Sequence, residues 1–177
     1  MATNSFSTYD RKTIALHWGS AALVLLLWTA GEFLDIFPKG TPRTMVRSVH
    51  ICLGIVLGFA LAYRIWWRNH GGTRFPLDSG VRYAKQANLA HWVLYVVMGF
   101  IVASGIALVW IRGDNLFNLV SVPAFDPGNK ELRHYAKEVH SWIANALLLG
   151  AMLHGVMAVW HQVVLKDDLL RRMLYRA

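Results

Sequence analysis

Four long apolar segments restrict what this chain can fold into more than any other feature of its sequence. An α-helix rises about 1.5 Å per residue, so about 20 apolar residues cross the roughly 30 Å hydrocarbon core of a bilayer. Inside lipid, every backbone polar group needs an internal partner, which favours helices. The segments are residues 13–33, 49–67, 89–111 and 139–165. We therefore predict an all-α fold, an integral membrane four-helix bundle that forms one domain over residues 1–177.

The composition excludes several other classes of protein. Apolar side chains make up 55% of the chain, more than in an ordinary soluble domain. The net charge of +8 lies at the borders of the apolar segments and forms no continuous face, which argues against nucleic-acid binding. The single cysteine, Cys52, excludes an internal disulfide and a cysteine-rich zinc or iron–sulfur site. The lipid bilayer is therefore the first partner that the sequence predicts.

The lysines and arginines beside the apolar segments predict the orientation, because such residues are retained on the cytoplasmic side. Both termini are predicted to be cytoplasmic, since this assigns the larger group to the inner side. The inner group is Arg11, Lys12, Arg64, Arg68, Arg74, Arg82, Lys85, Lys166, Arg171, Arg172 and Arg176. The outer group is Lys39, Arg43, Arg47, Arg112, Lys130, Arg133 and Lys137.

The connections between the helices contain prolines and glycines that interrupt helices. We predict three connections, an outer loop over 35–48, an inner loop over 68–88 and a longer outer loop over 112–138. In the last of these, residues 129–138 can begin the fourth helix before the membrane proper. Only Glu32 and Arg64 are charged within the apolar segments. Both lie near segment ends, where a long side chain reaches the interface, so we expect neither to have a function.

The histidines inside the apolar segments are the strongest functional signal. An imidazole in hydrocarbon is costly unless it faces the bundle interior, pairs with another group or binds a ligand. Of the eight histidines, those inside the segments are His17, His50, His91, His140, His154 and His161. The other two, His70 and His134, fall in predicted loops, where we expect ordinary solvated side chains.

Helical geometry arranges these histidines at two depths. His140 and His154 share a face of the last helix and are about 21 Å apart along its axis. Antiparallel threading places His50 level with His140 near the outer side. The inner level receives the remaining four, His17, His91, His154 and His161. Facing imidazoles at two levels predict two stacked haems, each bound by two axial histidines.

Residue counting leaves some alternatives open. Both His154 and His161 are possible partners of His17, because helix ends are uncertain by several residues. A zinc or copper site is less favoured than haem, since two opposed histidines leave a small ion short of ligands. The remaining alternative is that the histidines only form hydrogen bonds between helices.

Short motifs surround the histidines in a particular order. These are Leu16-His17-Trp18, Val49-His50-Ile51-Cys52-Leu53-Gly54-Ile55, Ala90-His91-Trp92, His140, Leu153-His154 and His161, followed by Lys166-Asp167-Asp168. With this order and spacing, the chain resembles the bacterial cytochrome b561 family of four-helix dihaem membrane proteins over nearly its whole length. The resemblance implies that His17 and His154 bind an inner haem b, and that His50 and His140 bind an outer one. It also implies a place in the bacterial inner membrane.

The resemblance further implies a reaction. Superoxide would be oxidised to oxygen at the periplasmic side, and electrons would pass through the two haems b to ubiquinone near the cytoplasmic side. His91 and His161 are implied to border the ubiquinone, and histidine suits this role because it supplies hydrogen bonds and protons near neutral pH.

The outer cations fit this reaction, because positive charge attracts a small anion and also binds haem propionates. Arg47, one turn before His50, is the predicted propionate or anion ligand. The alternative function is a haem b subunit that anchors a separate dehydrogenase or hydrogenase and links it to the quinone pool. A protein partner is therefore possible, but the sequence contains no direct sign of one.

Overall fold

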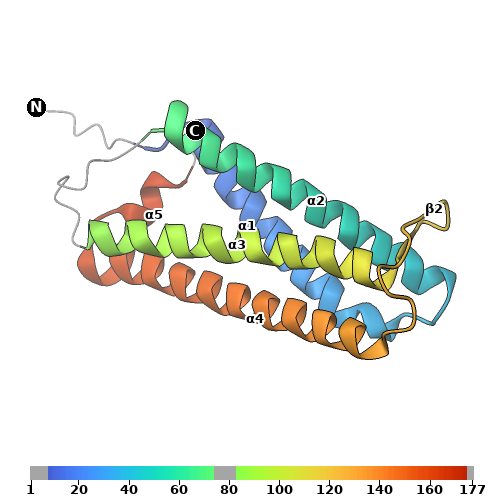
Figure 1. Ribbon diagram of the computed structural model, residues 1–177. Coiled ribbons are helices and arrows are strands. Elements are labelled where there is room, and N and C mark those ends of the chain that lie inside the picture. Colours follow the sequence, from blue (N-terminus) through green and yellow to red (C-terminus); the bar gives the residue numbers. More distant parts are fainter. Residues whose placement is uncertain (1–7, 74–82, 175–177) are drawn as a thin grey trace, which may run out of the picture.

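Four long helices run up and down the molecule in alternating directions (Figure 1). They are α1 (Arg11–Glu32), α2 (Thr41–His70), α3 (Ala84–Arg112) and α4 (Lys130–Trp160). The structure is a computed structural model and describes residues 8–73 and 83–174. In this part of the chain, four helices are long and apolar enough to cross a membrane. The predicted all-α four-helix architecture is therefore confirmed.

Short elements mark the two ends of the bundle. At one end, called here the hairpin end, β1 (Asn115–Leu116) pairs with β2 (Val120–Ser121) in an antiparallel hairpin. A 3-10 turn, η1 (Phe33–Ile36), follows α1 at the same end. At the opposite end, called the terminal end, α4 continues into the π-helix η2 (His161–Leu165), and α5 (Leu169–Arg172) follows.

The two ends of the described chain meet at the terminal end. The backbone N–H of Tyr9 donates to the carbonyl of Arg172 at 3.1 Å. The indole of Trp18 donates to the carbonyl of Met173 at 2.9 Å. Both ends of the described chain therefore lie on one side of the bundle, and the location of the termini in the cytoplasm stays a prediction.

The helices extend further than the apolar segments from which they were predicted. Helix α2 begins at Thr41, inside the segment 35–48 that was predicted to be a loop. Pro42 is tolerated there because the first helical turn needs no N–H donor. The early start of α4 is confirmed, and the side chain of Asn129 accepts a hydrogen bond from the backbone N–H of Leu132. Of the residues assigned to the inner side, Arg74, Arg82 and Arg176 lie outside the described residues.

The buried core lies in the middle of the bundle. Helix α1 packs most closely on α2, and α3 on α4, while the two halves touch less extensively. The core side chains come from all four helices and are Val24, Leu27, Leu57, Leu61, Tyr95, Met98 and Leu147. Leu147 is about two helical turns from both His140 and His154. This apolar layer therefore separates the two levels at which those histidines lie.

Asp10 connects the start of α1 to the end of α2. Its carboxylate caps α1 by accepting from the backbone N–H of Thr13 at 2.9 Å, and it also accepts from the indole of Trp67 at 3.1 Å. A third donor is the backbone N–H of Thr73 at 2.9 Å. Partial burial alone would raise the pKa of Asp10, but hydrogen bonds from Thr13, Thr73 and Trp67 outweigh it and hold the pKa well below its ordinary value.

We expect Asp10→Ala to lower the free energy of unfolding by about 1–2 kcal/mol at neutral pH, mostly through loss of the helix cap. Thermal unfolding of the detergent-solubilised protein measures this. Because the folded pKa is depressed, the carboxylate stabilises the fold above its unfolded pKa of about 3.9, and this stabilisation is lost as the pH falls through the folded pKa. The difference from wild type should therefore shrink in strong acid. A loss that does not change with pH contradicts this account.

Candidate functional site

Two pairs of histidine rings face each other inside the bundle, one pair near each end. At the terminal end, the ring centres of His17 on α1 and His154 on α4 are 6.1 Å apart. At the hairpin end, those of His50 on α2 and His140 on α4 are 6.3 Å apart. Each pair therefore connects the α1–α2 half of the bundle to α4.

The spacing of both pairs fits a metal bound between the rings. Two imidazoles on one metal place their ring centres about 6 Å apart, because each metal–nitrogen bond is about 2 Å and each nitrogen lies about 1 Å from its ring centre. Two nitrogens leave a small tetrahedral ion two ligands short, whereas they are the axial pair that a haem iron accepts. Among the described residues, no group of three or more His, Cys, Asp or Glu side chains is arranged to hold a metal ion.

A glycine leaves space for one of the rings at the hairpin end. A Cβ at Gly105 would lie 3.2 Å from Cε1 of His140, which is tighter than an ordinary contact, whereas a Cβ at Gly31 would meet Cε1 of His50 at an ordinary contact distance of 3.4 Å. Nδ1 of His50 is buried and has no hydrogen-bond partner among the described residues. An unpaired polar atom is costly in an apolar interior and is typical of a site that binds something. The residues present therefore fit a haem at this level.

Ser104 determines which nitrogen of His140 carries the proton. Its hydroxyl donates to the carbonyl of Ile101 at 3.0 Å, and the same oxygen lies 3.0 Å from Nδ1 of His140. Because a hydroxyl has only one hydrogen, the Ser104 oxygen accepts the N–H of Nδ1. Nε2 of His140 is then unprotonated, which is the state in which an imidazole binds a metal.

A guanidinium lies beside the pair at the terminal end. Nη2 of Arg64 donates to Nδ1 of His17 at 2.8 Å, and the guanidinium carbon is 5.2 Å from the ring centre of Tyr95. The sequence did not predict this contact, because it indicated only a long side chain near a segment end, within reach of the interface. The missed signal was in the sequence, since an arginine inside an apolar segment is by default a functional candidate.

The two histidines predicted to border ubiquinone have different surroundings. His91 on α3 faces the terminal-end pair, with its ring centre 5.0 Å from that of His154. His161 is 5% exposed, and its Nδ1 lies 2.5 Å from Oδ2 of Asp167. It begins η2, and π-helical turns are rare and frequent at functional sites. The structure thus brings His161 to a carboxylate and not to His17, which residue counting had left open.

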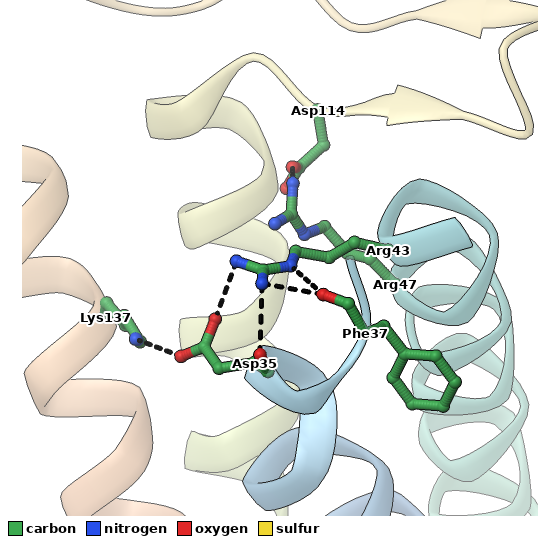
Figure 2. A network of polar contacts seen from close by, with 6 residues as sticks. All are labelled: Asp35, Phe37, Arg43, Arg47, Asp114 and Lys137. Atoms are coloured by element: carbon green, nitrogen blue, oxygen red, sulfur yellow. Dashed lines mark hydrogen bonds and ion pairs between the residues drawn. The ribbon is translucent and has the colours of Figure 1, made fainter. Parts of the chain in front are cut away.

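Asp35 forms ion pairs with two of the outer cations at the hairpin end (Figure 2). Its carboxylate lies 3.0 Å from Nη1 of Arg43 and 3.7 Å from Nζ of Lys137. Arg43 also donates to the carbonyl of Phe37 at 2.7 Å. The cluster of one aspartate and two cations keeps a net positive charge.

Asp114 holds a second cluster of the same kind. It is 3% exposed, and its carboxylate lies 3.3 Å from Nη1 of Arg47 and 3.5 Å from Nη1 of Arg112. Nε of Arg47 is buried without a hydrogen-bond partner among the described residues. Sequence reasoning missed Asp114 because a single aspartate in a loop has no distinctive pattern. The predicted role of Arg47 toward a propionate or an anion stays a prediction.

The fold and the paired imidazoles define a class, the membrane helical bundles whose buried histidines suit haem. The family model of prokaryotic cytochrome b561 matches residues 8–176, and the chain belongs to this family. It is therefore a multi-pass bacterial membrane protein of a family that binds haem b and transfers electrons.

Several curated proteins are similar to the chain over nearly their whole length. The probable superoxide oxidase CybB of Yersinia pestis is 28% identical over 173 residues, covering 94% of this chain and 95% of the relative. Cytochrome b561 homolog 2 of Escherichia coli (strain K12) is 29% identical over 184 residues, covering 97% and 94%. Cytochrome b562 of Cereibacter sphaeroides is 29% identical over 175 residues, covering 94% of each chain.

We expect Gly105→Val to remove or weaken one haem, because its side chain would displace the ring of His140. The matched control is Gly155→Val, since a Cβ at Gly155 on α4 meets nothing within 4 Å. Haem content per chain, measured from the absorbance of the purified variants, gives the result. A full haem content in Gly105→Val, or an equal loss in the control, contradicts this assignment.

Proposed function

We propose that the chain binds two haems b, one between His17 and His154 and one between His50 and His140. The observation that carries this proposal is the ring spacing of 6.1 Å in the first pair and 6.3 Å in the second. Haem, when bound, supplies the one-electron chemistry that protein side chains lack. The helices hold the imidazoles in opposed positions, and the apolar core around Leu147 excludes water from the region between the two levels.

Four alanine variants test the assignment of ligands. His50→Ala and His140→Ala should each lose the same haem, and His17→Ala and His154→Ala should each lose the other. A spectrum of the reduced minus the oxidised protein, with haem counted per chain, measures the loss. Removal of both haems by every variant would leave the two pairs unsupported.

On the hairpin side, the proposed substrate is superoxide. Two observations support this choice. The relative from Yersinia pestis is named a probable superoxide oxidase. The clusters around Asp35 and Asp114 each retain net positive charge, and a cationic surface with low-dielectric walls raises the encounter rate of a small anion. The hairpin end is then periplasmic, the terminal end is cytoplasmic, and the protein lies in the inner membrane.

At the terminal end, the proposed acceptor is ubiquinone. In the overall reaction, two superoxide anions lose one electron each and form two oxygen molecules, while one ubiquinone gains two electrons and two protons and forms quinol. Asp167 accepts the Nδ1 proton of His161, so Nε2 would donate to a quinone carbonyl when the ring carries its second proton. His91 is the second candidate donor. Protons reach both side chains from the cytoplasmic side without crossing the membrane.

A superoxide pulse tests the reaction. The purified protein is mixed with superoxide and a soluble ubiquinone analogue, and haem and quinol absorbance are followed together. We expect quinol to form at one molecule per two superoxide consumed, and superoxide dismutase to abolish it. The rate should fall as salt increases, because the attraction of the anion is screened. Haems that superoxide leaves oxidised contradict the proposed substrate.

The second candidate is a haem b subunit that connects a partner dehydrogenase or hydrogenase to quinone. One feature favours it, since Leu119 in the β1–β2 turn is 85% exposed and offers an apolar contact beyond the helices. Two haems that are indifferent to superoxide, but are reduced by quinol, would favour this function.

A further inference from the structure

Arg64 is a half-buried cation near the terminal end of α2, and it donates a hydrogen bond to an imidazole. Among the described residues, no carboxylate lies within ion-pair distance of it. Its contacts are Nδ1 of His17 at 2.8 Å and Tyr95, through both the ring and a side-chain hydrogen bond. A guanidinium that is partly removed from water is stabilised where an anion or a strong acceptor balances its charge. A neutral imidazole balances it only weakly.

The hydrogen bond from Arg64 conflicts with a metal on His17. A guanidinium is only a donor, so Nδ1 of His17 must accept, and the single ring proton is on Nε2. An iron bound at Nε2 requires the opposite tautomer, in which Nδ1 carries the proton and is itself a donor. Two donors cannot share a hydrogen bond. His140 shows no such conflict, because Ser104 accepts from its Nδ1.

We propose that Arg64 is a positioning residue for the terminal-end haem and binds one of its carboxylates. This inference rests on the proposed function. With haem bound, His17 would hold the iron through Nε2 and carry its ring proton on Nδ1, and the guanidinium of Arg64 would then be available to pair with a haem propionate. Arginine suits this role because it pairs with a carboxylate through two parallel hydrogen bonds.

This arrangement has a consequence for the reduction potential. Reduction adds one negative charge to the haem, and a fixed positive charge close by in a low-dielectric interior favours the reduced state. Arg64 therefore raises the potential of the haem at the terminal end. At the hairpin end, the group bonded to the ligand His140 is the neutral hydroxyl of Ser104, so the two haems differ in their immediate electrostatic surroundings.

The test is a redox titration of purified holoprotein, followed by haem absorbance, in wild type and three variants. In Arg64→Gln, the equilibrium constant for reducing one haem should fall at least tenfold, which is about 59 mV in midpoint potential. The affected haem should be the one that His17→Ala loses. Arg64→Lys keeps the charge and should change the constant less than threefold. The control Arg68→Gln removes a cation one turn away on the same helix, and it should change neither haem by threefold.

Several results would overturn the inference. These are unchanged potentials in Arg64→Gln with both haems bound, an equal fall in Arg64→Lys, or an equal fall in Arg68→Gln. If Arg64→Gln releases the haem altogether, infrared difference spectra of oxidised and reduced Arg64→Lys provide the answer. Propionate bands shifted from those of wild type support the contact, and identical bands refute it. A wild-type protein without haem refutes the proposed function itself, which separates the two failures.

Discussion

The cost of placing an imidazole in hydrocarbon is the constraint on which the rest of this structure depends. A membrane interior offers no water to satisfy a polar ring, so each intramembrane histidine must turn toward the bundle axis and find a partner. His17 faces His154 and His50 faces His140, so these polar rings point to the interior where the two halves of the bundle meet. Gly105 follows from the same requirement, because it leaves space for the ring of His140.

The fold and the two depths at which the histidines lie were predictable because both depend on long-range periodicity. Apolar segments of membrane length identify the helices, and the rise of a helix places His140 and His154 at two depths. The contacts of Arg64 and Asp114 were not predictable in this way. They depend on the rotation of each helix about its axis and on the path of a short hairpin, which spacing along the chain does not determine. The sequence also did not predict the start of α2, because Pro42 is typical of a loop and is equally accepted in the first turn of a helix.

The two ends of the bundle differ in where their positive charge lies. At the hairpin end, two carboxylates each form ion pairs with two cations, which position these cations and neutralise part of their charge. At the terminal end, the positive charge of Arg64 lies among the histidines themselves. An anion arriving from solution therefore meets its first cations at the surface of one end, whereas the cation at the other end acts on what lies inside the bundle.

Helix α4 supplies one histidine to each pair, while its partners come from two different helices. The distance between His140 and His154 is consequently set by the covalent rise of a single helix, about 21 Å, and not by how helices pack. Sliding of α4 against its neighbours displaces both imidazoles equally and in the same direction. The separation of the two levels therefore stays constant when the helices of the bundle move against one another in a fluid bilayer.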